Sequence, residues 1–370
     1  MKKSRRILFI INGLGMGNST RCHSIIEKLN DEGYSIDVVT SGNGIEYFKH
    51  NMSCINDLME IKSLFYKKYK GKLSIPVTIL LMPILAVFYT KNLFILYHIL
   101  KNKFYDAIII DSDYTIGLLR NFFSIPVFAI NNADIVVSEI EKLKKIPGNI
   151  FMQYLVEKMD YWFHYLFVDF VLSPTIIESY NNSSDSGDKI YHCPPLIRSG
   201  LTVTDNKKTV ENILVMLSGS QFATDVSFIE SKPNFPNISV TVIGRNGSSN
   251  EKVKYLGKVI NNKFQLNMAD ILIINAGFSA VSEAILLRKP CVVIPIDNHA
   301  EQYVNAHTMV DKGYAVIAGI DNVWEKTNEL IINYDVFRQA LDKKVLPLNG
   351  SFLAAKMIDA RIESIQGKIK

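Results

Sequence analysis

The sequence predicts an α/β protein made of two doubly wound, parallel-sheet domains, and three observations support this prediction. Short apolar runs alternate with helix-like segments through most of the 370 residues, which is the pattern of β-α-β units. The runs are rich in Ile, Val and Phe and nearly continuous, as is typical of strands covered on both faces. The alternation restarts in the second half of the chain, and the length suits two domains that each bury a core.

The first domain is expected over residues 1–195. Its predicted strands are Ile7–Ile11, Ile36–Thr40, Ala107–Ile110, Val127–Ile130 and Phe167–Leu172. The chain starts with basic residues and an apolar run, as a signal peptide does, but that run is only as long as one strand. It also ends in Asn12-Gly13 rather than in a cleavage site, so we interpret it as the first strand.

The second domain is expected over residues 205–346, after a linker near 196–208. Its predicted strands are Ile213–Leu217, Ser239–Ile243, Ile271–Ile274, Cys291–Ile294 and Tyr314–Ile317. A helix over residues 350–370 is expected to pack back on the first domain. Ligands of such sheets bind outside the carboxyl ends of the strands, so the two domains are predicted to face each other across a cleft lined by those ends.

The composition excludes several classes of protein. The net charge of +5 is too small for a nucleic-acid binder, although it suits attraction to phosphates or to an anionic membrane surface. Four cysteines show no CxxC spacing and no clustered histidines, so we expect neither a disulfide framework nor a zinc site, and a reducing compartment. These cysteines are Cys22, Cys54, Cys193 and Cys291.

A glycine-rich turn links the first predicted strand to a helix expected over Ser19–Asn30. Such a turn lets the backbone approach a ligand closely, and the following helix N-terminus favours an anion. Its candidate ligand-binding residues are Gly13, Gly15, Gly17 and Arg21. A dinucleotide site is disfavoured because the last glycine comes one residue early for G-x-G-x-x-G, and the second strand ends without a carboxylate. A turn that merely needs glycines is the remaining alternative.

A second candidate site follows the predicted strand Ile271–Ile274. The strand ends in Asn275-Ala-Gly277, and Ser279 is placed to cap the next helix, so backbone N–H groups there can hold a diphosphate. Glu283 can accept hydrogen bonds from both hydroxyls of a ribose. Acids are also common in first helical turns for dipole reasons, so this segment alone leaves the role of Glu283 open.

A third segment, Lys289–Ala306, is a proline-bounded strand followed by a polar loop and a helix. The loop and helix offer more hydrogen-bonding groups than a connector needs, and sugar hydroxyls require such a set. These groups are His299, Glu301, Gln302 and Asn305.

Taken together, these segments resemble glycosyltransferase family 28, the group of MurG-like enzymes, over nearly the whole chain and most specifically over residues 269–306. The resemblance implies a GT-B fold and an inverting transfer from a nucleotide sugar, usually a UDP-sugar, held mainly by the second domain. It implies that Glu283 binds the donor ribose. The residues that it places near the diphosphate are Gly277, Phe278 and Ser279; those near the sugar are Glu301 and Gln302; those that edge the nucleotide are Gly219, Ser220, Gly244 and Arg245.

The first domain departs from the family pattern at one position. Related loops commonly read G-x-G-x-G-H-x-x-R, and here the histidine is replaced by Asn18, which cannot take a proton from a hydroxyl and is expected to position or polarise it. Relatives also often carry a histidine after strand five, where this chain has Asn131-Asn-Ala-Asp134. The general base is therefore expected among Asp111, Asp113 and Asp134, with helix capping by Asp111 as the alternative.

Residues 60–104 form an insert in the first domain that is predicted to associate with a membrane. Its basic part is followed by the uncharged stretch Leu73–Thr90, in which Pro76 and Pro83 argue against a spanning helix. We interpret it as an interfacial helix pair on an anionic membrane, with a buried core helix and a true span as alternatives. The basic residues are Lys62, Lys67, Lys68, Lys70 and Lys72.

The expected activity is transfer of a hexose or N-acetylhexosamine from a nucleotide sugar to a lipid-linked or other glycan acceptor. We expect it in the cytoplasm, peripheral to the inner face of the cell membrane, without a nucleic-acid partner. No cofactor or metal is expected, because no DxD-type acidic pair ends a strand of the donor domain. The alternatives are a nucleotide-sugar epimerase or hydrolase of the same fold, and a non-catalytic partner subunit.

Overall fold

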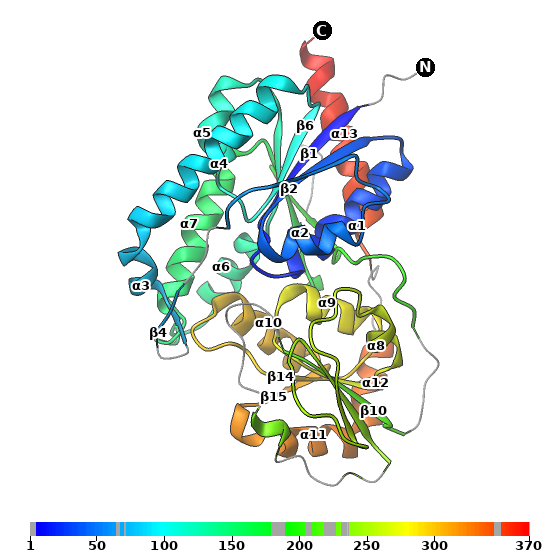
Figure 1. Cartoon of the computed structure of the whole chain (residues 1–370). Helices are drawn as coiled ribbons and strands as arrows, with labels where there is room; N and C mark the ends of the chain where they lie inside the picture. Colours follow the sequence, from blue (N-terminus) through cyan, green and yellow to red (C-terminus); the bar gives the residue numbers. More distant parts are fainter. Residues whose placement is uncertain are drawn as a thin grey trace. The chain divides into compact units, whose positions relative to one another are not determined.

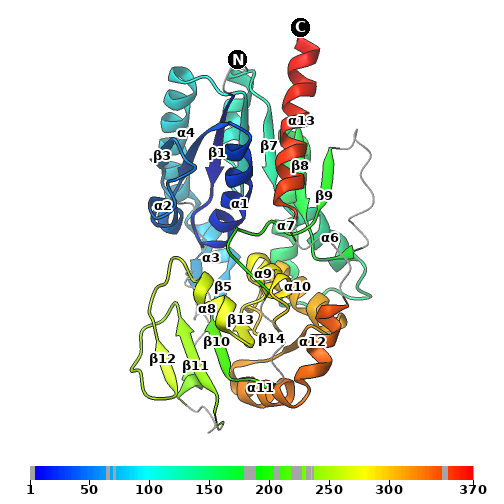
Figure 2. The same cartoon turned by 90° about the vertical axis from the view of Figure 1, so that its right-hand side faces the viewer.

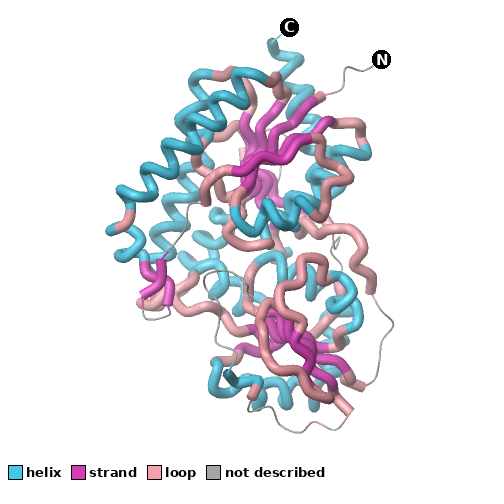
Figure 3. The backbone as a smooth tube through the Cα atoms, in the orientation of Figure 1, coloured by secondary structure: helices cyan, strands magenta, loops and turns pink. Residues whose placement is uncertain are grey.

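The computed structural model describes residues 5–63, 67–69, 72–178, 189–203, 209–217, 227–230, 235, 237–343 and 349–369. The chain divides into two compact units, each with strands at its centre and helices around them (Figures 1 and 3). The first unit comprises Met1–Ile146, Phe151–Arg198 and Asn349–Lys370, and the second comprises Pro147–Ile150 and Ser199–Leu348. The segment of the first unit that starts at Phe151 thus ends at Arg198, inside the linker predicted at 196–208.

The described part of the first unit contains a seven-stranded parallel sheet of order β3-β2-β1-β6-β7-β8-β9. Its strands are β1 (Arg6–Ile11), β2 (Ser35–Thr40), β3 (Asp57–Glu60), β6 (Ala107–Asp111), β7 (Val127–Ile130), β8 (Phe170–Pro174) and β9 (Ile190–Cys193). Strand β8 starts later than predicted because the helix before it continues to Phe167. Strands β3 and β9, at the two edges, were not predicted.

Helices cover both faces of this sheet (Figures 1 and 2). They are α1 (Gly17–Asp31), α2 (Gly42–Lys49), α3 (Ile75–Leu80), α4 (Met82–Asn102), α5 (Ile116–Leu119), the 3-10 turn η1 (Arg120–Phe122), α6 (Ala133–Glu141), α7 (Phe151–Phe167) and α13 (Ser351–Ile369). Leu8 and Ile10 of β1 join a core cluster with Leu96 of α4 and Ile116 of α5, while Phe9 between them is buried on the other face.

The last helix of the chain, α13, packs against α1 of the first unit (Figure 2). At its start, the Ser351 hydroxyl donates to the Ser24 hydroxyl at 2.8 Å, and both are buried. Further along, Arg5 donates to the Asp359 carboxylate at 2.8 Å. These contacts join the two ends of the chain in one unit.

The insert folds as a hairpin and two helices. Strands β4 (Lys67–Tyr69) and β5 (Lys72–Ser74) pair antiparallel, and α3 and α4 follow with a break at Leu81. The stretch predicted at Leu73–Thr90 is therefore not one helix, and Pro76 and Pro83 occupy the first turns where proline is tolerated. By length and composition α4 could cross a membrane, and only 17% of its most apolar window is buried.

The described part of the second unit contains a six-stranded parallel sheet of order β12-β11-β10-β13-β14-β15. Its strands are β10 (Asn212–Met216), β11 (Ser239–Ile243), β12 (Val253–Tyr255), β13 (Ile271–Ile274), β14 (Cys291–Val293) and β15 (Ala315–Ile317). Its helical segments are η3 (Ser227–Ile229), α8 (Lys263–Met268), α9 (Phe278–Leu286), α10 (Ala300–Asp311), η4 (Ile320–Asn322), α11 (Val323–Ile332) and α12 (Tyr334–Asp342).

The two sheets share one winding scheme. In each, the chain fills positions to one side of the first strand and then crosses back to the other side, so the switch lies between β1 and β6 in the first unit and between β10 and β13 in the second. This arrangement confirms the predicted doubly wound fold class. Ligands of such sheets bind outside the carboxyl ends of the strands at the switch, which directs attention to the turns after these strands.

Candidate functional site

In the second unit, the turn after β13 is held rigidly from two sides. The amide of Asn275 donates to the carbonyl of Ile294 at 2.7 Å, and the amide of Asn305 donates to the carbonyl of Ala276 at 3.0 Å. Both asparagines are buried. Asn305, predicted as a sugar ligand, thus uses its side-chain N–H to fix the turn.

Helix α9 starts directly from this turn with an open N-terminus. Its N-cap is Gly277, so the prediction that Ser279 is the cap is wrong: Ser279 lies inside the first turn, and no side-chain cap is found among the described residues. A Cβ at Gly277 would meet no atom of the described residues within 4 Å, so the backbone there has room for a ligand beside those residues. An uncapped helix N-terminus with space in front of it suits a diphosphate.

Glu283 lies beyond the first turn of α9, where the helix dipole stabilises an acid only weakly. Its side chain is buried, with 6% of the residue exposed. A buried carboxylate requires hydrogen-bond or charge partners to offset its lost hydration. The dipole explanation that the sequence left open therefore accounts poorly for Glu283.

The start of α10 carries a partly buried histidine, His299, and a buried glutamine, Gln302. His299 is the N-cap residue of α10, and burial lowers its pKa, with the Glu301 charge opposing that effect. The lowered pKa favours the neutral form of the ring, and its buried Nδ1 atom has no hydrogen-bond partner among the described residues. The Oε1 atom of Gln302 accepts from the backbone N–H of Ile296 at 2.9 Å, which holds the loop closed.

The turn after β11 has a left-handed backbone conformation that favours glycine. Gly244 has a φ of +81°, and its N–H donates to the carbonyl of Gly257 at 2.6 Å. Arg245 is partly buried, which lowers its pKa, and its Nη1 atom donates to the Gly244 carbonyl at 2.8 Å. Gly219 and Ser220, predicted to edge the nucleotide, lie outside the described residues.

The glycine-rich turn of the first unit uses its glycines differently. A Cβ at Gly13 would lie 1.6 Å from the carbonyl oxygen of Ser41, so only glycine fits there. A Cβ at Gly15 would meet nothing within 4 Å in the part of the chain that the structure describes, and Gly17 is the first residue of α1. The amide of Asn18 lies 3.4 Å from the carbonyl of Asn12 and donates to it. Gly13 is therefore needed by the fold, whereas Gly15 leaves space for a ligand.

Arg21 and Asp111, predicted as separate site residues, form one buried ion pair. The guanidinium donates from Nε and Nη2 to the two carboxylate oxygens, each at 2.6 Å, and the Cys22 thiol donates to Oδ2 at 3.2 Å. Asp111 is fully buried and Arg21 is 6% exposed. The pair ties α1 to the end of β6, a structural role that the sequence did not predict and that leaves Asp111 poorly placed to act as a base.

Asp113 is also almost fully buried. Its Oδ1 atom accepts from the backbone N–H of Thr115 at 2.8 Å. Burial raises the pKa of this carboxyl, and the hydrogen bonds from Thr115 reduce the rise. A carboxyl with a raised pKa is a candidate base, but little of it reaches solvent.

Asp134 is the centre of a polar cluster at the carboxyl edge of the sheet. Its Oδ1 atom accepts from the Ser173 hydroxyl at 2.7 Å, and its Oδ2 atom lies 2.7 Å from Nε2 of His192. The side chains of Asp134 and His192 are 13% and 16% exposed. His192 was missed by the sequence analysis because its strand, β9, is short and follows a polar stretch that was read as interdomain loop.

Asn131, directly after β7, organises the neighbouring helices. Its Oδ1 atom accepts from the backbone N–H of Ala133 at the start of α6 at 2.8 Å. Its Nδ2 atom donates to the Asp160 carboxylate on α7 at 2.7 Å. Asn131 thus sets the position of α6, which carries Asp134.

Within the described ranges, no group of three or more His, Cys, Asp and Glu side chains is arranged to hold a metal ion. All four cysteines are buried and unpaired. The prediction that no metal takes part stays a prediction.

A family model described as Glycosyl transferase family 1 matches residues 5–331 of this chain. The chain is 26% identical over 185 residues to a Clostridium botulinum UDP-N-acetylglucosamine–N-acetylmuramyl-(pentapeptide) pyrophosphoryl-undecaprenol N-acetylglucosamine transferase, a match that covers 46% of the chain and 50% of that protein. The chain thus spans about half the length of this relative. The MurG-like resemblance is confirmed, although the matching model is described as family 1 rather than family 28.

Two solved structures extend the likeness to the whole chain. Acinetobacter baumannii MurG has a TM-score of 0.56 at 15% identity, covering 96% of this chain and 99% of its own. Arabidopsis thaliana UGT89C1, complexed with UDP-L-rhamnose, has a TM-score of 0.64 at 13% identity, covering 98% and 99%. At these identities the likeness shows the fold, which is GT-B.

We predict that Asp111→Asn destabilises the first unit by roughly 3 kcal/mol, because it leaves the Arg21 guanidinium buried without its counter-charge. Urea unfolding followed by fluorescence in a Trp324→Phe background, where Trp162 is the remaining tryptophan, measures this unit. Adding Arg21→Gln should recover part of the loss, since it removes the unpaired charge. An Asp111→Asn protein as stable as its parent would contradict the structural role.

Proposed function

The chain belongs to glycosyl transferase family 1, and we propose that it transfers a hexose or N-acetylhexosamine from a UDP-sugar to a lipid-linked acceptor, with inversion at the anomeric carbon. The observation that carries the donor part is the turn Asn275–Gly277 with the open start of α9 and the buried Glu283 behind it. The turn suits a diphosphate and the carboxylate suits two ribose hydroxyls. The UDP-sugar in the Arabidopsis complex and the UDP-sugar named for the Clostridium relative support the same donor class.

The sugar end of the donor is assigned to the loop before α10. His299 has a buried nitrogen that lacks a partner among the described residues, and such an atom is expected to gain one when a ligand binds. Glu301 and Gln302 follow it in the first turn of α10. The open N-terminus of α9 stabilises the leaving diphosphate through its backbone N–H groups.

For the proton, we take Asp134 as the general base in place of Asp111. The acceptor oxygen attacks the anomeric carbon, the bond from that carbon to the diphosphate breaks, the diphosphate leaves with the bonding pair, and the hydroxyl proton passes to Asp134. A carboxylate has about four lone-pair positions, so the donors Ser173 and His192 leave it able to accept a proton. His192 and Ser173 are positioning residues in this scheme, and Asp113 is the second candidate base.

The membrane part of the proposal rests on the outer side of α3 and α4. Apolar side chains stand exposed along it, among them Leu80 at 77%, Val87 at 53% and Phe94 at 65%. On the inner side of α4, Asn92 is buried. Its Oδ1 atom accepts from the backbone N–H of Lys62, and its Nδ2 atom donates to the Lys62 carbonyl, each at 2.8 Å. An apolar face next to lysine-rich chain suits a helix lying in the interface of an anionic membrane, where a lipid-linked acceptor is presented.

We predict that UDP binds and that Glu283→Gln weakens this binding by about 1.5–3 kcal/mol, the range for hydrogen bonds to a charged group. Glu325→Gln, which removes an acid from the first turn of α11, is the matched control and should keep parental affinity. Isothermal titration gives both affinities. Equal affinity in a folded Glu283→Gln protein would return Glu283 to a structural role.

We predict that Asp134→Asn lowers kcat by roughly 10²- to 10⁴-fold, the usual contribution of a general base, while KM for the donor changes little. His192→Gln and Ser173→Ala should each lower kcat less, because the carboxylate remains. Turnover is measured with a panel of UDP-sugars and lipid-linked acceptors. Parental rates in Asp134→Asn together with a loss in Asp113→Asn would move the base to Asp113, and donor consumption without any acceptor would indicate a hydrolase or epimerase.

We predict that the protein co-sediments with vesicles containing phosphatidylglycerol, and that added salt weakens the association. Phe94→Ser should reduce binding because it removes exposed apolar surface from α4. Phe264→Ser is the matched control, since Phe264 is 71% exposed on α8 of the second unit. Equal losses in the two variants would argue against a specific role for the α3–α4 surface.

A further inference from the structure

Helix α7 buries polar side chains and exposes apolar ones, which is the reverse of what an ordinary surface helix does (Figure 1). Gln153 and His164 are 6% and 2% exposed, whereas Met159 and Leu166 are 70% and 62% exposed. Core packing alone therefore does not explain the polar residues that this helix keeps inside. One of them, Asp160, was not among the site residues predicted from the sequence.

Asp160 lies on the same side of α7 as Gln153 and His164, and its side chain is 13% exposed. Its Oδ2 atom accepts from Nδ2 of Asn131, directly after β7, at 2.7 Å. Nδ1 of His164 lies 3.1 Å from the Oδ1 atom of Asp160 and 2.9 Å from its backbone carbonyl oxygen. Because a carbonyl oxygen can only accept, Nδ1 carries a proton.

The partners of Asp160 keep it charged in this buried position. Burial raises the pKa of Asp160, but the hydrogen bonds from His164, Asn131 and Tyr114 outweigh that effect and hold the pKa below its ordinary value. Tyr114 stands in the turn after β6 and Asn131 in the turn after β7. One carboxylate on α7 is thus a shared acceptor for two turns at the carboxyl edge of the sheet.

The hydrogen bond to Asp160 sets the orientation of the Asn131 amide. Since Nδ2 donates to Asp160, the Oδ1 atom is left to accept from the backbone N–H of Ala133, the first residue of α6, at 2.8 Å. The backbone N–H of Asn131 donates to the carbonyl of Leu172 on β8 at 3.0 Å. The start of α6 is therefore fixed to both α7 and β8.

Asp134 is the second residue of α6, so its place follows from that start. Its two partners, Ser173 and His192, stand on β8 and β9. Tyr161, next along α7 from the buried acid, is close enough for the Asp134 charge to raise the pKa of its phenol, in addition to the effect of burial. Asp134 thus lies between the sheet and α7, and it meets both partners only where Asn131 holds α6.

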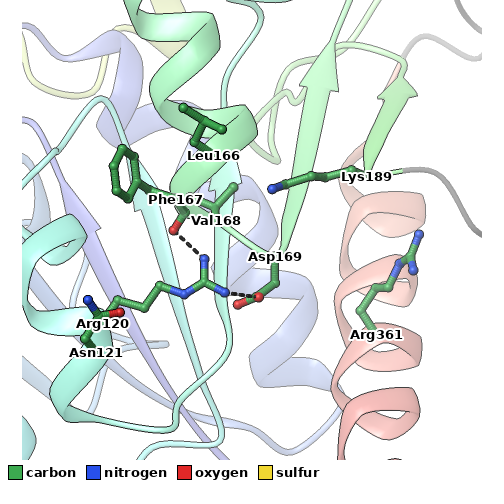
Figure 4. Close-up of a pocket in the computed structure, with 8 residues that line it drawn as sticks. All are labelled: Arg120, Asn121, Leu166, Phe167, Val168, Asp169, Lys189 and Arg361. Carbon is green, nitrogen blue, oxygen red and sulfur yellow. Dashed lines mark hydrogen bonds and ion pairs between the residues drawn. The ribbon is translucent and has the colours of Figure 1, made fainter.

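The far end of α7 is also held, which makes the helix a rigid support. Nη1 of Arg120 donates to the carbonyl of Phe167, the last residue of α7, at 2.6 Å, and its Nη2 atom donates to the Asp169 carboxylate (Figure 4). These residues line a cavity of about 490 Å³ together with Lys189 and Arg361. A side chain on an anchored helix can hold its partner in a defined place.

We propose that the hydrogen bond between Asn131 and Asp160 positions the general base of the transfer reaction, so that both are positioning residues for Asp134. This inference rests on the function proposed above for Asp134. A base must lie within hydrogen-bond reach of the proton that it takes, and a displacement of about 1 Å can lower the rate about a hundredfold. Loss of the hydrogen bond therefore lowers kcat, while the donor, assigned to the second unit, binds as before.

The test reverses the pair. In Asn131→Asp, two carboxylates face each other across the 2.7 Å contact, which displaces α6, and kcat should fall roughly tenfold or more. In Asn131→Asp/Asp160→Asn, the new amide donates to the new carboxylate, which still accepts from Ala133, and most of the lost kcat should return. UDP affinity should stay parental in both. Fluorescence of Trp162 in the Trp324→Phe background reports whether the first unit is folded.

Asn56→Asp is the matched control. Nδ2 of Asn56 donates to the buried carboxylate of Asp37 at 3.1 Å, also in the first unit. Asn56 stands directly before β3, at the edge of the sheet opposite to Asp134. The same substitution there creates the same kind of repulsion away from the base, so kcat should stay parental.

A positioning role and a merely structural role differ once the base is removed. If Asn131 acts through Asp134, Asn131→Asp should lower the kcat of the Asp134→Asn protein no further. A merely structural role predicts that the two losses multiply. If Asn131→Asp does not fold, Asn131→Ala, which removes the amide without adding a charge, replaces it in this comparison and should lower kcat in the parent alone.

Three results overturn the positioning role. They are a parental kcat in the folded Asn131 variant, a reversed pair no more active than Asn131→Asp, and losses that multiply with that of Asp134→Asn. The first of these, together with a loss in Asp134→Asn, contradicts the positioning role and leaves the proposed base in place. A parental rate in Asp134→Asn contradicts the proposed base, and this inference with it.

Discussion

Parallel strand pairing is the constraint on which the rest of this protein depends. Because every pair within the two large sheets runs parallel, all strands of a unit end at one edge and start at the other. The turns that follow the strands therefore gather polar side chains at the carboxyl edge, such as Asp134 in the first unit. The amino edge gathers the residues that begin strands, and there the backbone N–H groups need acceptors.

The acids of the two edges accordingly do different work. Asp106, Asp169 and Asp270 each stand directly before a strand and accept from the first N–H of its neighbour, which fixes the alignment of two adjacent strands. At the carboxyl edge, the Asp111 carboxylate is fully buried in an ion pair with Arg21, whereas the Asp134 side chain is 13% exposed to solvent. Burial and partners, and not residue type, thus separate acids that maintain the fold from one that can exchange a proton.

The same distinction applies to the cations of the first unit. Arg21 is paired in full with Asp111, whereas Arg120 divides its guanidinium between the Asp169 carboxylate and the Phe167 carbonyl. The exposed apolar side of α3 and α4 gives the first unit a feature suited to a lipid surface. The second unit carries the turns suited to a nucleotide.

The sequence by itself determined where most of the central strands lie along the chain and that a glycine turn follows β13. These follow from short-range patterns: continuous apolar runs of strand length, prolines at strand ends, and glycine next to a helix start. Only the tertiary structure decided that Arg21 meets Asp111, 90 residues away, and that Ser173 and His192 meet Asp134 across 39 and 58 residues. It also decided that α13 brings Arg361 to Lys189. Periodicity reports which face of an element is buried, whereas side-chain partners depend on which strands become neighbours, and that order is set by the packing of the whole sheet.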